Sequence, residues 1–483
     1  MILEKFIDVL GSEKVSDDPK ILEEFSQDLS FVAARKPIGV VRPKGRDDVQ
    51  KIVDIAKENK IPLVPCSSGP PRFHGDTIPV LGGSVIVDLS GMNNILTINR
   101  RNKIAAVEAG VTFEQLIPEL KKYGLRPYMP LLPRRTKSAL MSAVEREPIL
   151  MPRYHWDMLD PLVSVEVIYG TGDVFRTGEA SLIESLEELE EGAFSGPMGP
   201  GQFDPVRIIQ GAQGTMGIIT WGILRCELAP KLQRLYFVPS MDLGNLIEFV
   251  YAILRRRLGE EVFLLNNFSF ANIVGEKFNE INELTNALPH WILILNLAGY
   301  ERFPERRVEY QERDVRNIAK QFGLELVTSV SDVGDKEFLK ILESLPKQYW
   351  KLKYKGCFQD IPFLSTLDRI PEFIDVMLRA AEKFNYPSTE LGMYIQPVIQ
   401  GVACHCEFNL MYDRANAVER ERVKNLYIRA SESLISHGAF FSRPYGELAK
   451  MIYNRDAETT FLLRKVKEIF DPNWIMNPGR LCF

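Results

Sequence analysis

A glycine-rich stretch, Gly211-Ala-Gln-Gly-Thr-Met-Gly-Ile-Ile-Thr220, has residue types and spacing that could bind a cofactor. Its three glycines, Gly211, Gly214 and Gly217, lead directly into the β-branched residues 218–220. Because glycine permits positive φ and has no Cβ, such a turn can bring backbone N–H groups close to a flat or anionic ligand. A tight turn between strands is also typical of this pattern, so the stretch alone leaves both interpretations open.

A second group of reactive side chains is Cys404-His405-Cys406-Glu407, which contains metal-ligating residue types. A C-x-C pair supplies two ligands at most, and no second pair follows at the spacing of a zinc site. A β-strand explains the pattern better, because alternation places the two cysteines on one face and His405 and Glu407 on the other. We therefore predict a strand here and no metal site.

The size and charge of the chain restrict the classes of function. With 483 residues, two or three domains are expected. The hydrophobic content of 45% and the charged content of 25% are ordinary for a globular protein. The formal net charge is −5 and no basic run is present, which argues against nucleic-acid binding and favours a small-molecule or protein partner.

The sequence shows no targeting pattern. Residues 1–10 suit an amphipathic helix better than a signal peptide, because charged residues interrupt the apolar ones. The longest apolar runs are too short to cross a membrane. The six cysteines follow no disulfide-framework spacing, so we expect reduced thiols and a cytoplasmic location.

The N-terminal half must position the glycine-rich stretch, and its pattern predicts helices and short strands. Residues 1 to about 35 are predicted to be helical. Strands at 38–42 and 61–65 flank a one-faced helix at 47–58, which predicts a small parallel sheet with a crossover helix. Thr112 followed by Gln115 predicts a capping box for a helix that ends near Gly124. The remaining expected elements are strands at 84–88, 95–98 and 104–109, a hairpin at 162–176 and an acidic surface insertion at 184–191.

From residue 234 onward, strands alternate with longer helices. Strands are predicted at 235–239, 262–268 and 291–297, and helices at 243–258, 305–321, 371–384, 418–437 and 455–470. This pattern indicates an α+β domain, with one sheet that carries helices on a face.

Several of these motifs occur in an order that resembles a known family. The motifs are the strand at 61–65 with its loop, the series 85–95, Ala109-Gly-Val-Thr112, residues 165–178, residues 210–220 and the closing Asn477-Pro-Gly-Arg480. Together they resemble the vanillyl alcohol oxidase / p-cresol methylhydroxylase family of FAD-linked oxidoreductases. This family also contains glycolate oxidase subunits and D-lactate dehydrogenases. The resemblance covers residues 36–230 and the last forty residues, and the middle follows loosely.

The resemblance implies an α+β architecture with a two-lobed, PCMH-type FAD-binding domain. Residues 1–230 would form this domain, and residues 441–483 would return to close it. Residues 231–440 would form an α+β cap domain over the flavin. The implied chemistry is hydride transfer from a substrate carbon to flavin N5, followed by reoxidation by a separate acceptor, without a nicotinamide cofactor.

The resemblance also implies which residues contact FAD. The expected cofactor-binding residues are Ser67, Ser68, Gly69, His74, Gly75, Ser138, Gly211, Gly214, Thr215, Gly217, Ile219, Asn477 and Arg480. His74 is a candidate for covalent attachment, but we expect FAD to be bound non-covalently.

The sequence departs from the family pattern in three places. Pro70 and Pro71 lack N–H groups in the loop that would hold the pyrophosphate. Leu140 and Met141 stand where the family has glycines, and Arg153-Tyr154-His155 stands where it often has Arg-Tyr-Gly. Either FAD binds in an altered pose or the subunit has lost it, and we expect FAD to be bound.

The expected catalytic residues are His405, Glu407, Arg443 and Tyr445, in a pocket without a metal. Histidine suits the role of base because its pKa is close to neutrality. Arg443 could hold a carboxylate or a phenolate with its planar fork, and with Tyr445 it could polarise a phenolic substrate. The alternative is that His405 is an ordinary buried histidine and Arg443 a surface partner of Glu447.

Other residues could reach the same cavity. Lys353 and Lys355 alternate with apolar residues as in a strand, although a solvated strand face is the simpler explanation. His155 and Trp156 could lie near the flavin ring, and packing explains Trp156 equally well.

These observations predict an FAD-dependent dehydrogenase that oxidises a hydroxy acid or an aromatic alcohol-type substrate. No cytochrome motif or C-x-x-C cluster is present, so electrons would pass to an acceptor protein or an iron–sulfur subunit, and we expect an oligomer or a complex subunit. The alternative is a subunit with degenerate cofactor loops that serves as a scaffold or electron conduit. A third hypothesis is metal-assisted oxidation of a D-2-hydroxy acid.

Overall fold

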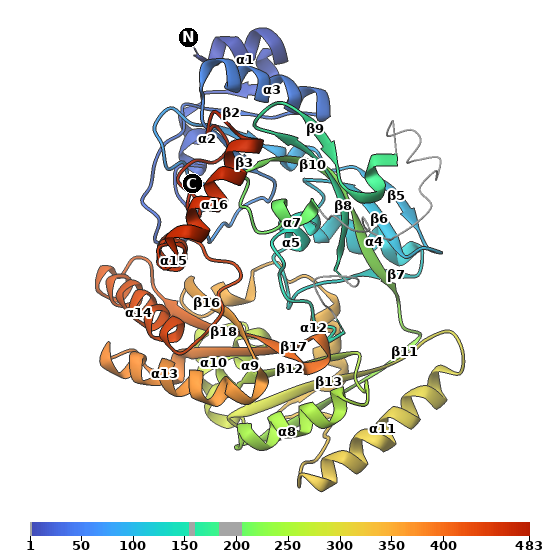
Figure 1. Cartoon of the computed structure of the whole chain (residues 1–483). Coiled ribbons are helices and arrows are strands. Elements are labelled where there is room, and N and C mark those ends of the chain that lie inside the picture. The colour runs from blue at the N-terminus through green and yellow to red at the C-terminus, as the bar shows by residue number, and fades with distance from the viewer. Residues whose placement is uncertain (1, 154–159, 183–204) are drawn as a thin grey trace.

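In the described residues, three larger β-sheets and a two-stranded ribbon organise the fold (Figure 1). The computed structural model describes residues 2–153, 160–182 and 205–483. The expectations for His155, Trp156 and residues 184–191 lie outside the described residues. Across the described ranges, no helix combines the length and the apolar character that a membrane span requires.

The first sheet is built from N-terminal residues in the order β1-β2-β4-β3. Its strands are β1 (Val15–Ser16), β2 (Gly39–Val41), β3 (Leu63–Cys66) and β4 (Val85–Asp88). β2 and β3 both run parallel to β4, and α3 (Arg46–Asn59) makes the crossover between them. The apolar face of α3 packs on this sheet and on α1 (Ile2–Leu10). The predicted parallel sheet with a crossover helix is confirmed.

The prediction of helix throughout residues 1–35 is wrong in its second part. α2 (Pro19–Glu24) ends early, and residues 26–38 contain no helix. The Leu29 carbonyl accepts a hydrogen bond from Tyr412 Oη at 3.2 Å, and Phe31 stacks on the Tyr412 ring. Contacts with a distant part of the chain therefore fix this segment, and local sequence does not reveal them.

The second sheet is antiparallel and contains the glycine-rich stretch at the start of its central strand. Its strands are β5 (Ile95–Asn99), β6 (Ile104–Glu108), β10 (Gly217–Leu228), β8 (Leu162–Tyr169) and β9 (Val174–Arg176), with β7 (Leu125–Pro127) paired to β10. Its helices are α4 (Phe113–Lys122), α5 (Ala139–Val144) and α7 (Val206–Ile209). The capping box of α4 is confirmed, because Gln115 N donates to Thr112 Oγ1 at 3.3 Å and Thr112 N donates to Gln115 Oε1 at 3.0 Å.

The third sheet has six antiparallel strands in the order β11-β13-β12-β17-β18-β16. They are β11 (Leu232–Ser240), β12 (Glu261–Asn266), β13 (Trp291–Gly299), β16 (Cys357–Ser365), β17 (Leu391–Val398) and β18 (Ala403–Tyr412); the separate ribbon is β14 (Ser329–Val330) with β15 (Val333–Gly334). This sheet and its helices form the expected cap.

Helices cover both faces of the third sheet, whereas the sequence predicted helices on one face. α8 (Leu243–Leu254), α11 (Pro304–Gln321), α13 (Ile370–Lys383) and α14 (Ala417–Ser436) share a core with one face. α9 (Asn267–Val274), α10 (Phe278–Ala287) and α12 (Asp335–Glu343) pack on the other. The prediction fails because the strands of this sheet are apolar on both faces, so both need a cover.

The C-terminal segment returns to the N-terminal sheet, as Figure 1 shows for α16 beside β3. After α15 (Gly446–Tyr453) and α16 (Ala457–Phe470), the chain runs along β3. Leu63 N donates to the Ile475 carbonyl at 2.7 Å, and Asn477 N donates to the Leu63 carbonyl at 2.8 Å. The predicted fold class, two lobes closed by the C-terminal tail plus an α+β cap, is confirmed. The domain limits at residues 230 and 440 stay a prediction.

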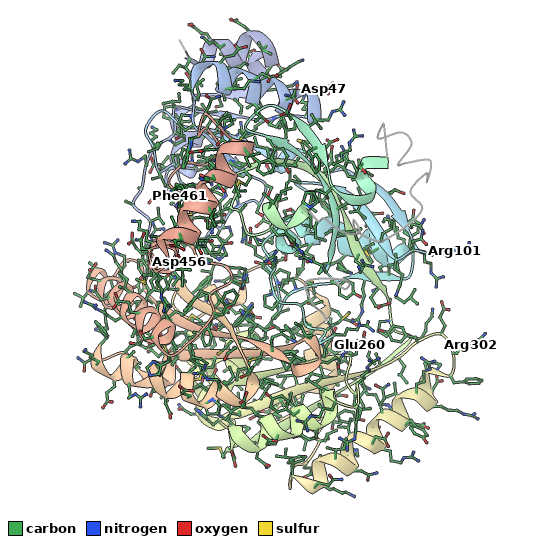
Figure 2. All side chains as sticks on the ribbon, in the orientation of Figure 1. Asp47, Arg101, Glu260, Arg302, Asp456 and Phe461 are labelled. Carbon is green, nitrogen blue, oxygen red and sulfur yellow. The ribbon has the colours of Figure 1, made fainter. Side chains whose placement is uncertain are left out.

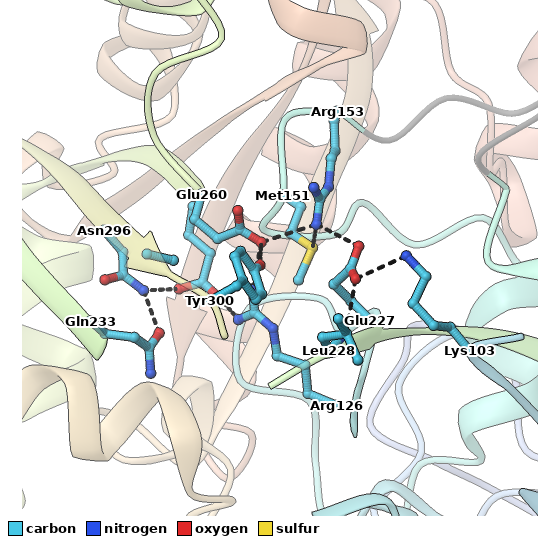
Figure 3. Close-up of polar contacts among 12 residues, drawn as sticks. Lys103, Arg126, Met151, Arg153, Glu227, Leu228, Gln233, Glu260, Asn296 and Tyr300 are labelled. Carbon is cyan, nitrogen blue, oxygen red and sulfur yellow. Dashed lines mark hydrogen bonds and ion pairs between the residues drawn. The ribbon is translucent and has the colours of Figure 1, made fainter. Parts of the chain in front are cut away.

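An ion-pair network joins the second sheet to the cap where β10 leads into β11 (Figure 3). Arg126 binds Glu260 at 2.7 Å and Glu261 at 2.8 Å. Arg153 binds Glu260 at 3.0 Å and Glu227 at 2.8 Å. We call these five residues the junction network. Because most of these side chains are well shielded from solvent, the network fixes the cap relative to the lobes more firmly than exposed pairs would.

Candidate active site

Two cavities adjoin each other, and the larger one lies where the lobes meet the cap. The larger has a volume of about 660 Å³ and is lined from both ends of the chain and from the cap. The smaller has a volume of about 100 Å³ and is lined by the loop after β3 and the glycine-rich stretch. Phe73, His74, Arg134 and Lys137 line both cavities, so a ligand in one lies beside the other.

The smaller cavity brings together many of the residues expected to bind the cofactor. Those that line it are Ser67, Ser68, His74, Gly211, Gly214, Gly217 and Ile219. Segments from opposite ends of the N-terminal half thus form one wall, as the sequence predicted. Their contact with a cofactor stays a prediction.

Backbone conformation explains two of the glycines. Gly211 has φ +72° and Gly214 has φ +70°, a region that residues with a Cβ rarely adopt. A Cβ at Gly214 would lie 2.4 Å from Pro65 Cγ, so a side chain there would also clash. A Cβ at Gly211 would meet no described atom within 4 Å, which leaves open space beside the bare backbone.

Five other residues expected to bind the cofactor line neither cavity in the described structure, and Asn477 is one of them. The other four each use a polar group within the chain. Gly69 N donates to Thr136 O, Gly75 N to Asp28 Oδ2, Ser138 Oγ to Ala109 O and Thr215 Oγ1 to Ala212 O. These residues shape the walls through hydrogen bonds with other parts of the chain.

Two residues of the C-terminal tail present unpartnered polar atoms near the cavities. Asn477 Nδ2 donates to the Asp76 carbonyl at 3.1 Å and to the Gln213 carbonyl at 2.7 Å. Arg480 lines the larger cavity and donates to a backbone carbonyl. Asn477 Oδ1 and Arg480 Nε are buried and find no hydrogen-bond partner among the described residues. Buried polar atoms usually have partners, so a polar ligand would complete this site.

The alternation predicted for residues 404–407 is confirmed in β18. Cys404 and Cys406 belong to the core between the sheet and its helices, and Glu407 lines the larger cavity from the other face. His405 is 2% exposed and does not line the cavity in the described structure. Its Nε2 lies 3.5 Å from Glu407 Oε2, and burial lowers the pKa of His405.

Glu407 belongs to a buried polar cluster that the sequence did not reveal. Lys351 Nζ lies 2.5 Å from Glu407 Oε1 and 2.5 Å from Asp360 Oδ2. Asn409 Nδ2 donates to Asp360 Oδ1 at 2.5 Å and to Glu407 Oε1 at 2.8 Å. We call Lys351, Asp360, Glu407 and Asn409 the Lys351 cluster. Lys351, Asp360 and Glu407 line the larger cavity.

The two carboxyl groups of this cluster differ in acidity. Burial and the neighbouring Glu407 raise the pKa of Asp360 to about 7. Burial would also raise the pKa of Glu407, but the Lys351 ammonium and His405 hold it well below its usual value. The pKa of Lys351 is raised, because the two carboxylates outweigh the effect of burial.

Arg443 and Tyr445 also line the larger cavity. The carboxylate nearest to Arg443 is Glu147 at 4.0 Å, whereas Glu447 pairs with Lys450 at 2.7 Å. The alternative in which Arg443 is the partner of Glu447 is therefore wrong. The Tyr445 ring stacks on His74, with centroids 4.3 Å apart.

Comparison with known proteins agrees with this geometry. Residues 37–178 match a family model described as FAD binding domain, and residues 274–481 match one described as FAD linked oxidases, C-terminal domain. The chain belongs to the FAD-linked oxidoreductases. It is an FAD-dependent oxidoreductase of the vanillyl alcohol oxidase / p-cresol methylhydroxylase family, and FAD is its cofactor.

Relatives extend over nearly the whole chain at low identity. An FAD-linked oxidoreductase of Mycobacterium tuberculosis is 22% identical over 98% of this chain and 97% of its own length. The mitochondrial D-lactate dehydrogenase (cytochrome) of Arabidopsis thaliana is 24% identical over 93% of this chain and 74% of its own. Among solved structures, 4-ethylphenol oxidase from Gulosibacter chungangensis matches with a TM-score of 0.84 at 18% identity, covering 99% of this chain and 96% of that one. The last likeness shows a shared fold.

The residues of this FAD-linked oxidoreductase fit its cofactor despite the departures in sequence. Leu140 is fully buried and packs towards Gly222, where a Cβ would lie 2.7 Å from Leu140 Cδ1. Leu140 thus fills the core of the second lobe, and Met141 forms part of the wall of the smaller cavity. With the open backbone at Gly211 and the unpartnered atoms of Asn477 and Arg480, the site fits a polar dinucleotide.

Lys353 and Lys355 neither line the larger cavity, as one interpretation held, nor lie on the solvated strand face that the sequence favoured. Residues 350–352 form a short 3₁₀-helix, η4, and the following residues turn, so the alternation of a strand does not apply. Lys353 donates to backbone carbonyls of residues 273 and 275, and Lys355 binds Glu390 and Glu419. Lys351 takes the cavity position instead.

Metal ligation finds no support in the residues that the structure describes. In those ranges, no group of three or more His, Cys, Asp or Glu side chains could hold a metal ion. Glu407, the carboxylate beside His405, instead pairs with Lys351, a cation that would repel a metal ion.

Proposed function

We propose that this FAD-linked oxidoreductase is a dehydrogenase of a small hydroxy acid. Arg443 is the observation that supports it best. Its side chain is 10% exposed, lines the larger cavity and has its nearest carboxylate 4.0 Å away. A guanidinium in this position can bind a substrate carboxylate with two parallel hydrogen bonds.

The other residues of the cavity have distinct roles in this proposal. FAD supplies the redox chemistry by accepting a hydride from the substrate carbon. Tyr445 and His74 form a flat wall, and the Lys351 cluster, with His405 behind Glu407, receives the proton of the substrate hydroxyl. The lobes and the cap enclose the substrate, which strengthens these electrostatic contacts by excluding water.

We further propose that the electrons leave through a separate acceptor. The name of the Arabidopsis relative includes the word cytochrome, which supports an acceptor protein. An iron–sulfur subunit is the other candidate. The cytoplasmic location, the assembly into an oligomer or complex and the domain limits 1–230, 231–440 and 441–483 belong to the same proposal.

An aromatic alcohol-type substrate is a second candidate, because one wall of the larger cavity is aromatic. Phe73 lies 5.3 Å from the Tyr349 ring and 4.8 Å from the Phe358 ring. A planar substrate could pack against these rings, while Arg443 held its phenolate. The name of the 4-ethylphenol oxidase supports this alternative. The alternative in which the subunit is a scaffold or electron conduit without catalysis is the least favoured. The chain has both a small cavity beside the glycine-rich stretch and a larger one with room for a substrate.

Anaerobic mixing of the purified holoprotein with D-lactate, L-lactate, D-mandelate or 4-ethylphenol tests this function. We expect a 2-hydroxy acid to bleach the flavin absorption. In Arg443→Met, loss of a charged hydrogen-bonding partner should raise the KM for that acid roughly 10- to 100-fold. Arg455→Met removes an exposed arginine that lines neither cavity, and should leave KM unchanged.

Three results would count against the proposal. Bleaching by 4-ethylphenol alone would favour the aromatic alternative. Equal effects of Arg443→Met and Arg455→Met would exclude Arg443 as the anchor. Absence of bleaching by all four probes in a flavin-containing preparation would contradict oxidation of these substrate classes.

A further inference from the structure

We propose that Asp360 is the catalytic base that takes the proton of the substrate hydroxyl. This inference rests on the proposed function and names the group within the Lys351 cluster that performs the step. The sequence had favoured His405 for this role.

The position of Asp360 supports this role. It projects from β16, which pairs with β18 so that residue 360 lies opposite Asn409. Lys351 Nζ holds Asp360 Oδ2 and Asn409 Nδ2 holds Oδ1, each at 2.5 Å. Because both oxygens accept hydrogen bonds, the orientation of the carboxylate is fixed. Asp360 also lines the larger cavity.

The charge balance of the cluster leaves one carboxyl group that can exchange a proton near neutral pH. Asp360 and Glu407 share a single ammonium, so the cluster carries an excess negative charge when both are ionised. His405 Nε2 also lies 3.5 Å from Glu407 Oε2, and the pKa of Glu407 is held well below its usual value. Burial and Glu407 raise the pKa of Asp360 to about 7, which is near the value that suits a base at neutral pH.

The groups that face Asp360 come from η4 with the residue before it and from β18. Lys351 lies on η4 and Tyr349 immediately precedes it, while Glu407 and Asn409 lie on β18. His405 is separated from the cavity by its position behind Glu407. With its lowered pKa, it is neutral at pH 7 and positions Glu407.

The substrate O–H bond breaks and its proton moves to the ionised Asp360 carboxylate. The two electrons of that bond form the C=O double bond, and the hydrogen on the same carbon leaves as a hydride to oxidised flavin. The substrate loses two electrons and two protons in total, and Asp360 later releases its proton to solvent.

The pH dependence of the holoenzyme with D-lactate or D-mandelate tests this assignment. Because the base must be ionised, kcat/KM should fall about tenfold per pH unit below pH 7 and reach a plateau above it. Asp360→Asn should lower kcat by roughly 10²- to 10⁴-fold and remove this limb. Asp360→Glu, which keeps a carboxyl group, should restore part of the rate. Asp375→Asn, an exposed aspartate on α13, is the matched control and should behave as wild type.

A readout without turnover separates this inference from the proposed function. Infrared difference spectra of the wild-type holoprotein should show a protonated-carboxyl band that titrates near pH 7 and is missing in Asp360→Asn. The inference is overturned if that band is absent, or if Asp360→Asn keeps the pH limb and a kcat within tenfold of wild type. Failure of every hydroxyl substrate in a wild type that shows the band would overturn the proposed function instead.

Discussion

Lys351 determines the charge state of the cavity. Its ammonium lies 2.5 Å from carboxylate oxygens of both Asp360 and Glu407, and its side chain is 5% exposed. Two carboxylates at such depth are tolerated only with a cation that is well placed, because burial opposes ionisation. The residue thus permits one carboxylate to stay ionised while the other titrates near neutral pH.

Substitution of this cation should therefore have a large and pH-dependent effect on stability. At pH 7, Lys351→Met leaves two buried carboxyl groups without a cation and should destabilise the fold by about 3–5 kcal/mol. In Lys351→Met, burial without the cation should raise the folded-state pKa values of Asp360 and Glu407 above their unfolded values. Their protonated forms are favoured, so the stability lost at pH 7 should return as the pH falls towards 5.

Urea unfolding of wild type and variant at pH 5 and pH 7 measures this effect. Lys347→Met, which removes an exposed lysine four residues earlier, is the control and should change the midpoint little. A Lys351→Met deficit that is equal at both pH values would mean that packing, and not charge, explains the loss.

At the level of residues, the sequence predicted what local periodicity determines. Alternation placed His405 and Glu407 on one face of a strand, and the structure agrees. Asp360 and Lys351 could not be found this way, because their approach depends on the register between β16 and β18 and on the 3₁₀ turn of η4. The local signal is an acidic residue, Asp360, in a mainly apolar strand.

At the level of elements, α16 connects the glycine-rich stretch to the C-terminal tail. Lys467 is fully buried on its inner face and donates to the Thr215 carbonyl, to Asp471 at 2.5 Å and to the Met476 carbonyl at 2.9 Å. On the outer face of the same helix, Phe461 projects into solvent (Figure 2). One ammonium therefore connects three segments around the smaller cavity.

Loss of this connection should weaken FAD binding. Lys467→Met removes charged hydrogen bonds worth about 2 kcal/mol, which corresponds to a roughly 30-fold weaker FAD affinity if the loop depends on them. Flavin released on ultrafiltration of the holoprotein measures the change. Lys465→Met, an exposed lysine on the same helix, should retain FAD as wild type does. Equal retention in both variants would show that the loop holds its shape without Lys467.

Elements with strong local signals were predicted well, and those fixed by distant contacts were not. The capping box at Thr112 and the parallel sheet with α3 follow from short motifs. Residues 26–38 lack a helix because they bridge the first lobe and the cap, where Phe31 meets Tyr412. No window of local sequence contains that information.

For the whole molecule, contacts on two sides hold the cap over the lobes. The junction network connects them where β10 leads into β11, and residues 29–31 connect them beside the larger cavity. Exposed pairs such as Arg100–Glu301 add little to this connection. The arrangement keeps the smaller cavity beside the larger one.

The claim on which this account depends is that the two adjoining cavities hold FAD. The absorption spectrum of the purified protein, recorded before and after acid precipitation, tests it most directly. The account predicts flavin bands in near-stoichiometric amount, with the flavin recovered in the acid supernatant because no covalent bond holds it. A colourless protein that takes up no FAD when the cofactor is added would contradict the account.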